Sequence, residues 1–386
     1  MSFLYIFNNG VISKGMSGSE TWCDELIKVW LKKKYRIKVF APRIAEHRFA
    51  GNDIDFISTD NSGLEPGLTL HIAFSLVKRT VKTLLLLHKA AECEMFFCAS
   101  DNIADNIPAF YFKLKNPGVK WVTGTYLIAP SPIKGYKNAV TGKVSIPGPR
   151  SILYYMIQKF VYILIKLKAD TVMVLNHIDE KELAKRKFDP KKILVVYGAI
   201  DHGAIKAGKK MEKRYDAVFV GREHPQKGIP DLLEVWEYIC GRMPDVKLGM
   251  IGNFRSVEDD IRKKGLENNI LLLGYMNGSR KYDCLRSAKV FLLPSYYESF
   301  AVVAVEAMAC RLPIIAYDLP VFREIYTQGM LFVPIGDRAK MAETFLKLIK
   351  NDDLREKYSG MAYEHSKKFR WEDRAESILK SVRNHG

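Results

Sequence analysis

Residues 292–316 read LLPSYYESFAVVAVEAMACRLPIIA and decide how the carboxyl-terminal half of this chain folds. A buried strand ends at Pro294, a polar loop follows, a helix begins near Phe300, and residues 313–316 predict the next strand. Strands joined through a helix in this way lie parallel in one sheet. The segment therefore predicts an α/β fold with crossover helices.

The same alternation of short apolar runs and helical segments extends over the whole chain. The first series of predicted strands covers residues 3–7, 36–40, 54–57, 95–99, 120–125, 171–175 and 193–197, and the second covers 216–220, 247–251, 270–273, 290–293, 313–316 and 331–334. Between them, residues 204–214 (AIKAGKKMEKR) are polar and aperiodic and predict a linker. We expect two parallel-sheet domains, residues 1–203 and 215–365. Two such sheets side by side form a cleft, because each binds ligands beyond the carboxyl ends of its strands.

Composition excludes several classes of protein. With 48% hydrophobic and 27% charged residues, the chain is neither disordered, collagen-like nor a disulfide scaffold. Its longest stretches without charged residues are thirteen residues long, too short to cross a bilayer, and its start lacks the pattern of a secretory signal. The six cysteines are scattered and include no CxxC pair. We expect a cytoplasmic protein, either free or peripheral on the cytoplasmic face of a membrane.

Positive charge is concentrated in one interval. The formal net charge is +17, and residues 106–169 contain ten basic residues and no acidic residue. Such a surface suits phospholipid, polyanionic glycan or nucleic acid, and a merely solubilising face is the alternative. Within the interval, residues 149–168 (PRSILYYMIQKFVYILIKLK) predict either a helix in a membrane interface or a core helix with a basic exposed side.

Two carboxylates stand out in residues 292–316. Glu306 is the one charged residue on a helix that is otherwise apolar on every face, so it requires a partner. A salt bridge to Arg311 is one solution, and a ribose offering two hydroxyls is a better one. Glu298 lies in the preceding loop, beside the amides at Phe300 and Ala301 at the expected helix start. This combination suits a sugar diphosphate, because the amides can bind its phosphates and the carboxylate of Glu298 can bind its sugar hydroxyls.

A second segment supplies cations. In residues 217–236, AVFVGREHPQKGIPDLLEVW, a strand ends at Gly221 and a loop precedes the next helix. Arg222 and Lys227 would project above the sheet edge, where they could hold a diphosphate and offset charge on a departing nucleoside diphosphate. The alternative is a solvated loop.

The phrase VGREHPQKG, followed about seventy residues later by ESFAVVAVEAMA, resembles the retaining GT-B glycosyltransferases of the family-four type, also called glycosyl transferases group 1. Asn176, the turn at residues 197–201 and the glycine turn at 251–253 match the same family. The resemblance implies two Rossmann-like domains that face each other across a cleft. The first would bind the acceptor and the second the nucleotide sugar, and residues 366–386 would form a helix that crosses back to the first.

The resemblance also implies residue roles. Arg222 and Lys227 would hold the donor diphosphate, Glu298 would contact the donor sugar, and Glu306 would bind the ribose. The other donor-binding residues would be Gly18 in a glycine loop, Gly221, Tyr275, Met276, Ser299, Phe300 and Ala301. The acceptor side of the cleft would include Asp105, Thr125 and Tyr126.

Two departures from the family pattern affect the expected mechanism. Many relatives carry a histidine where this chain has Thr125 or Tyr126, and neither side chain is a base near neutral pH. Ala301 replaces the usual glycine after Phe300. We therefore expect the leaving phosphate to take the proton of the acceptor hydroxyl, and the sugar to keep its anomeric configuration.

Neither a metal nor another cofactor is expected, because Arg222, Lys227 and the helix amino terminus already supply positive charge. The DxD pattern at residues 53–55 is interpreted as chance, since it falls in a short predicted strand where the two aspartates share a face.

The expected acceptor is a glycan or a lipid-linked saccharide, and residues 130–149, rich in glycine and proline, would form a loop over the cleft. Two rival functions remain open at this point. A UDP-sugar epimerase would share the two-domain architecture, and a nucleic-acid-binding protein would explain the net charge. No nucleic-acid partner is expected if the transferase assignment is correct.

Overall fold

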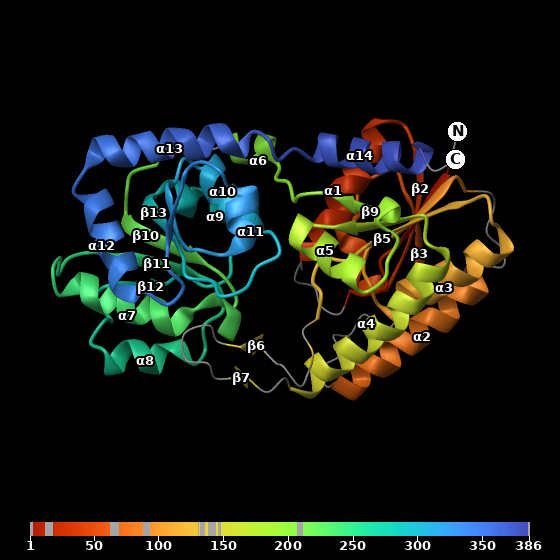
Figure 1. The fold of residues 1–386 in the computed structure, drawn as a ribbon, viewed down its shortest axis with the longest axis horizontal. Coiled ribbons are helices and arrows are strands. Elements are labelled where there is room, and N and C mark those ends of the chain that lie inside the picture. Colours follow the sequence, from red (N-terminus) through yellow and green to blue (C-terminus); the bar gives the residue numbers. More distant parts are fainter. Residues whose placement is uncertain are drawn as a thin grey trace. The chain divides into compact units, whose positions relative to one another are not determined.

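The computed structural model describes residues 3–11, 18–61, 69–87, 93–129, 131, 136–137, 144–145, 148–206 and 211–384. The chain divides into two compact units (Figure 1). Unit 1 comprises Met1–Tyr136, Val144–Gly198 and Trp371–Gly386, and unit 2 comprises Lys137–Lys143 and Ala199–Arg370. Each unit is built on its own parallel sheet.

Unit 1 contains a seven-stranded sheet with the order β3-β2-β1-β4-β5-β8-β9. Its strands are β1 (Phe3–Phe7), β2 (Arg36–Ala41), β3 (Asp55–Ser58), β4 (Met95–Cys98), β5 (Lys120–Gly124), β8 (Thr171–Val174) and β9 (Ile193–Val195), and all neighbours pair in parallel. Strands β1 and β4 are almost entirely buried, as expected for a sheet that is covered by helices on both faces.

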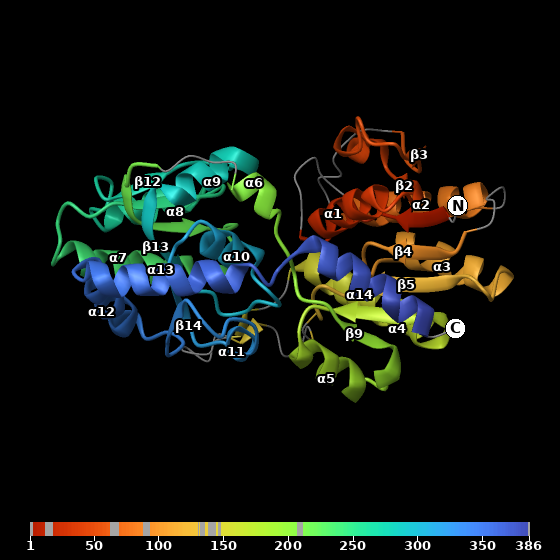
Figure 2. The same ribbon diagram turned by 90° about the horizontal axis from the view of Figure 1, so that it is seen from above.

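The helices of unit 1 form two layers. They are α1 (Gly18–Lys32), α2 (Thr69–Leu87), α3 (Ile103–Lys115), α4 (Pro149–Lys168), α5 (His177–Lys185) and α14 (Trp371–Asn384), with short 3-10 turns at η1 (Arg43–Arg48) and η2 (Pro190–Lys192). Helices α2, α3 and α4 pack side by side, and α1 packs on α14 (Figures 1 and 2). Trp22 and Trp371 meet edge to face at 5.0 Å in this second contact, so the last helix is part of the unit 1 core.

Unit 2 contains a six-stranded parallel sheet with the order β12-β11-β10-β13-β14-β15. Its strands are β10 (Tyr215–Val220), β11 (Leu248–Ile251), β12 (Ile270–Leu272), β13 (Ala288–Leu293), β14 (Ile314–Tyr317) and β15 (Met330–Val333). Its helices are α6 (His202–Lys206), α7 (Ile229–Cys240), α8 (Val257–Lys263), α9 (Gly278–Arg286), α10 (Val302–Ala309), α11 (Pro320–Ile325), α12 (Arg338–Ile349) and α13 (Asp352–Ser366), and η3 (Pro225–Lys227) is a 3-10 turn. Strands β6 (Tyr136–Lys137) and β7 (Val144–Ser145) form a separate pair.

The structure confirms the α/β class and every predicted strand, with ends that differ by one or two residues. Two expectations need correction. The predicted linker begins inside helix α6, and its residues 207–210 lie outside the described residues. Residues 130–149, which were predicted to form a loop, contain the short strands β6 and β7. Most of the other residues in this range lie outside the described part of the chain.

Candidate functional site

An enclosed ion pair joins two loops at the carboxyl edge of the unit 2 sheet. Lys227 Nζ lies 2.5 Å from Glu298 Oε1, and the two side chains are only 13% and 7% exposed. Lys227 follows β10 and Glu298 follows β13, and these strands are neighbours in the sheet. The loops are also tied through their backbones, because the amide of Tyr296 donates to the carbonyl of Gln226 at 2.8 Å. The structure thus brings together two residues that the sequence had singled out separately.

Gly228 permits this close approach. Its φ is +65°, in the left-handed region, and a Cβ on it would lie 2.0 Å from the carbonyl oxygen of Pro294. Only glycine fits such a position without moving the loop that carries Glu298. The glycine after Lys227 therefore determines how near the cation comes to the carboxylate.

A buried polar cluster holds the loop that carries Glu298 through Tyr296. This cluster was not predicted from the sequence. The hydroxyls of Tyr296 and Tyr317 both donate to Oδ2 of Asp231, and Arg338 Nε lies 3.4 Å from Oδ1. Burial, together with the hydrogen bond to Asp231, raises the pKa of Tyr317 far above its usual range, so this hydroxyl stays protonated. The acidic residue in the first turn of α7 is the only sequence signal for the cluster.

Glu306 on α10 forms a salt bridge, but not to Arg311, which the sequence analysis gave as one possible partner beside a ribose. Lys281 of α9 places Nζ at 2.6 Å from Glu306 Oε1, and the hydroxyl of Tyr282 donates to the same oxygen at 3.4 Å. The guanidinium of Arg311 instead lies over the ring of Tyr363, at 4.2 Å from its centroid. A buried carboxylate did require a cation, but the cation comes from another helix. Among the described residues, none donates to the second oxygen, Oε2.

The helix start in this region also needs correction. Helix α10 begins at Val302, and Ala301 is its amino-terminal cap with φ 60° and ψ 69°. The amides of Phe300 and Ala301 therefore precede the first turn, whose unpaired N–H groups begin at Val302. The carbonyls of Phe300 and Ala301 both accept from the hydroxyl of Tyr326.

The remaining donor-side residues lie at the same edge of the sheet. Arg222 directly follows Gly221 at the end of β10 and is exposed, and within the described chain it forms no ion pair or hydrogen bond. Burial and the charges of Arg222 and Lys227 lower the pKa of the neighbouring His224. Tyr275 and Met276 follow β12, where Tyr275 is exposed and Met276 half-buried. Ser299 is buried beside Glu298.

Of the three residues predicted to line the acceptor side, Asp105 and Thr125 are buried and Tyr126 is half-buried. Asp105 is fully buried and accepts hydrogen bonds from the backbone amide of Asn9, at 2.7 Å, and from the hydroxyl of Ser100. Thr125 is also buried, and the Tyr126 ring packs 5.8 Å from that of Trp22. Asp105 and Thr125 thus pack inside unit 1 in this structure, and their role toward an acceptor stays a prediction.

Asp105 belongs to a network that anchors the loop after β1. Arg79 donates to the carbonyls of Asn9, at 2.9 Å, and Val11, at 2.5 Å, and pairs with Asp60 at 3.3 Å. Burial raises the pKa of Asp105 to about 7. The predicted glycine loop continues from here, but its residues 12–17 lie outside the described residues, and Gly18 is the first residue of α1.

The two aspartates of the DxD pattern do not both lie in a strand. Asp55 lies in β3 and pairs with Lys38 at 3.1 Å, whereas Asp53 precedes the strand. In the parts of the chain that the structure describes, no group of three or more His, Cys, Asp or Glu side chains is placed to hold a metal ion. No described helix is both long enough and apolar enough to cross a membrane.

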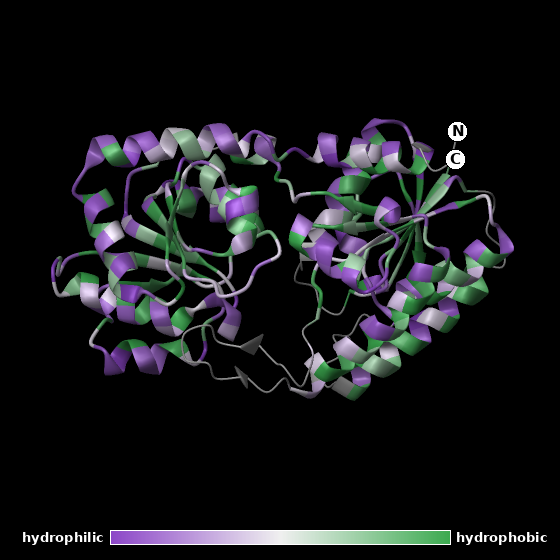
Figure 3. Cartoon of the chain, viewed as in Figure 1, coloured by the Kyte–Doolittle hydropathy of each residue, from purple (hydrophilic) through white to green (hydrophobic). Residues whose placement is uncertain are grey.

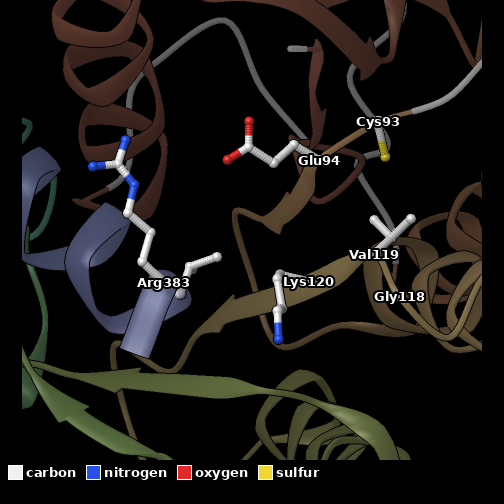
Figure 4. A pocket seen from close by; sticks show the side chains of 7 residues that line it. Cys93, Glu94, Gly118, Val119, Lys120 and Arg383 are labelled. Carbon is white, nitrogen blue, oxygen red and sulfur yellow. The ribbon is translucent and has the colours of Figure 1, made fainter. Parts of the chain in front are cut away.

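A pocket of about 270 Å³ opens elsewhere, at the amino ends of β4 and β5 in unit 1 (Figure 4). Its lining residues are Cys93, Glu94, Gly118, Val119, Lys120, Val382 and Arg383. Open α/β sheets bind their ligands at the opposite, carboxyl edge. The pocket is therefore not a candidate for the predicted site.

Comparison with known proteins identifies the unit that carries the ion pair. Residues 203–365 match the family model described as glycosyl transferases group 1. Residues 203–365, the part of the chain that this model matches, are here called the group 1 domain. Phosphatidyl-myo-inositol mannosyltransferase of Mycobacterium leprae is 35% identical over 169 residues, which cover 42% of this chain and 45% of that protein. The match thus spans less than half the length of this relative and of the same enzyme from Mycolicibacterium smegmatis.

Solved structures extend the likeness in fold to the whole chain. Sucrose-phosphate synthase of Thermosynechococcus elongatus gives a TM-score of 0.75 at 16% identity and covers 100% of this chain and 99% of its own. An Anabaena protein solved in complex with UDP-glucose gives a TM-score of 0.75 at 14% identity, with 100% of both chains covered. The fold is GT-B, and both Lys227 and Glu298 belong to its group 1 domain.

Replacing Gly228 by alanine should destabilise the group 1 domain by roughly 2 to 4 kcal/mol, because the new methyl group collides with Pro294 in addition to adopting a left-handed conformation. Gly265→Ala is the matched control, since Gly265 has the same φ of +65° with nothing within 4 Å, and should cost only about 1 to 2 kcal/mol. Urea unfolding of both variants measures the difference, and equal losses would contradict the close-approach argument.

Ala301→Gly should raise the free energy of unfolding by roughly 0.5 to 1 kcal/mol. Glycine adopts the left-handed conformation without the steric cost that alanine has there, and this gain outweighs the extra entropy that glycine adds to the unfolded chain. Ala304→Gly, the same change inside helix α10, should lower the free energy of unfolding by about 1 kcal/mol or more. Urea unfolding curves give the sign of both changes. A destabilised Ala301→Gly variant would refute the strain at this cap.

Asp105 predicts a measurable pH dependence of stability. Its pKa in the folded protein, about 7, lies above the ordinary value of 3.8, so the folded state binds the proton more tightly. This contribution to stability is present at low pH and is lost as the pH rises toward 7. Asp105→Asn should therefore gain stability relative to the native protein, by more than about 1 kcal/mol, between pH 5 and pH 7.5. Urea titrations across this range test it, with the exposed Asp353→Asn as the control that should show no such gain.

Proposed function

We propose that this chain is a retaining hexosyltransferase that moves a sugar from a nucleoside-diphosphate sugar to an acceptor hydroxyl. The observation that carries the proposal is the enclosed Lys227–Glu298 pair at the carboxyl edge of the group 1 domain, with the exposed Arg222 beside it. The cations match a diphosphate, and the carboxylate matches sugar hydroxyls. The mannosyltransferase name of the M. leprae relative and the UDP-glucose complex of the Anabaena protein support the same chemistry.

The ion pair has a specific role in this mechanism. Lys227 and Glu298 form an ion pair, so their charges offset each other. A bound donor would draw Lys227 and Arg222 to its diphosphate and leave Glu298 to accept hydrogen bonds from the sugar. As the bond between the anomeric carbon and the phosphate oxygen breaks, the same two cations stabilise the charge that develops on the leaving diphosphate.

The nucleophile is the acceptor hydroxyl, which attacks from the face that the phosphate leaves. The new bond forms between its oxygen and the anomeric carbon, and its proton passes to the departing phosphate oxygen. This route retains the configuration and requires no side-chain base, which suits the buried Thr125 and the Tyr126 phenol, whose pKa burial raises well above its usual range. It also requires no metal ion, since Arg222 and Lys227 supply the charge.

The ribose would bind at Glu306. Lys281 and Tyr282 both contact Oε1, and the contacts among described residues leave Oε2 for hydroxyl donors. The acceptor is proposed to be a glycan or a lipid-linked saccharide, and the lipid in the name of the M. leprae relative favours the second.

A panel of UDP-, GDP- and ADP-hexoses tests the proposal, with release of nucleoside diphosphate as the measurement. Lys227→Met and Glu298→Gln should each lower kcat by roughly 10²- to 10³-fold, because each removes a group that acts on the donor. Lys264→Met, which breaks an exposed Lys–Glu pair in the same domain, is the matched control and should leave kcat unchanged. Thermal unfolding of all three variants checks that they are folded.

The other outcomes of this assay are also informative. An isomerised sugar nucleotide formed without acceptor would assign an epimerase instead. Duplex binding that weakens steeply with salt, together with no donor turnover, would assign a nucleic-acid-binding protein. Activity that EDTA abolishes and Mn²⁺ restores would refute the metal-independent mechanism.

A further inference from the structure

Three helices on one face of the unit 1 sheet present apolar side chains to solvent. In the described part of the chain, fifteen large hydrophobic side chains are exposed, and twelve of them lie on α2, α3 and α4. The twelve, here called the apolar face, are Leu70, Phe74, Val77, Val81, Leu85, Tyr111, Leu114, Ile152, Met156, Phe160, Ile163 and Leu167. The helices pack side by side, and Figure 3 shows hydrophobic residues along them. Single exposed hydrophobics are ordinary, but a concentration of this kind marks an interaction surface.

The apolar residues follow helical spacing on both outer helices. On α2 they recur at steps of three or four residues from Leu70 to Leu85, and Leu70 and Phe74 are 80% and 71% exposed. On α4 they recur in the same way from Ile152 to Leu167. Each helix therefore exposes one continuous apolar stripe, while its other side packs on the unit. Exposed Lys159, Lys166 and Lys168 also lie on α4, so the exposed side of this helix is both apolar and basic.

The charges beside the apolar face are of one sign. Helices α2 and α4 contain no Asp or Glu, and the one acidic residue of α3, Asp105, is fully buried. Among the side chains of the three helices that the structure describes, the exposed charged residues are lysines, among them Lys82, Lys115, Lys159 and Lys168. Lys159 and Lys115 lie over the rings of Tyr155 and Tyr111, at 5.1 and 5.9 Å from the ring centroids. Apolar side chains, aromatic rings and lysines together are typical of helices in a lipid interface.

The charge pattern distinguishes between two occupants. A second copy of the chain, docked through the same face by a two-fold axis, would bring lysines against lysines. A bilayer with anionic lipids instead offers hydrocarbon to the apolar stripes and negative headgroups to the lysines.

We propose that α2, α3 and α4 form a docking face that lies in the interface of an anionic lipid bilayer. The inference rests on unit 1 alone and does not depend on the glycosyl-transfer proposal. If both hold, the face brings the enzyme to the surface where a lipid-linked acceptor resides.

Co-sedimentation of the full chain with lipid vesicles tests the proposal. The protein should bind vesicles of phosphatidylcholine with about 30% phosphatidylglycerol at low salt, and bind pure phosphatidylcholine at least about tenfold more weakly. The double variant Phe74→Gln/Phe160→Gln should lose at least about tenfold in binding to the anionic vesicles, because both rings leave the interface. Lys82→Gln/Lys159→Gln should lose a similar factor at low salt.

Ile178→Gln is the matched control, since Ile178 is an exposed apolar residue of unit 1 that lies on α5 and on none of the three helices. It should bind like the native protein. Donor hydrolysis without vesicles should be unchanged in all these variants, so a failed docking face and a failed transferase assignment give different results. Absent binding to anionic vesicles, equal binding by the Phe74/Phe160 variant, or a dimer in solution that this variant dissociates would each overturn the proposal.

Discussion

The approach of Lys227 to Glu298 is the constraint around which the group 1 domain is arranged. Neither charge can be enclosed alone, since an unpaired buried ion costs far more than the pair. The pair exists because β10 and β13 are neighbouring parallel strands whose following loops emerge at one edge. Gly228 allows the two loops to come into contact. Asp231 accepts a hydrogen bond from Tyr296, which lies in the loop that carries Glu298. Backbone geometry and a buried polar cluster thus together hold Lys227 Nζ at 2.5 Å from Glu298 Oε1.

Unit 1 organises polar groups for a different purpose. Asp105, Asn9, Arg79 and Asp60 are buried together, and their hydrogen bonds hold the loop that follows β1. Charged groups in a core are usually evidence of a fixed backbone rather than of reactivity. Position along the sequence does not distinguish framework carboxylates from acceptor-binding ones, because both kinds lie near strand ends, so a role of Asp105 toward an acceptor stays a prediction.

The features that the sequence predicted are those encoded locally. Strand positions follow from apolar runs within a few residues, and the burial of α10 follows from its apolar circumference, so both were predictable. The partner of Glu306 was not, because Lys281 lies on another helix and spacing along the chain carries no information about it. The start of α10 was placed too early because a left-handed alanine at 301 is rare and has no sequence signal. The stripe on α2 was detectable from the spacing between Leu70 and Leu85 alone.

An enclosed lysine that already has a carboxylate partner discriminates among anions. Inorganic phosphate would have to separate the Lys227–Glu298 pair and would leave Glu298 without compensation. A spent nucleotide would face the same cost, because it lacks the hexose. Only a ligand with both a diphosphate and adjoining hydroxyls compensates both halves of the pair. Under the proposed function, this contact would favour binding of the intact donor over binding of the released nucleoside diphosphate.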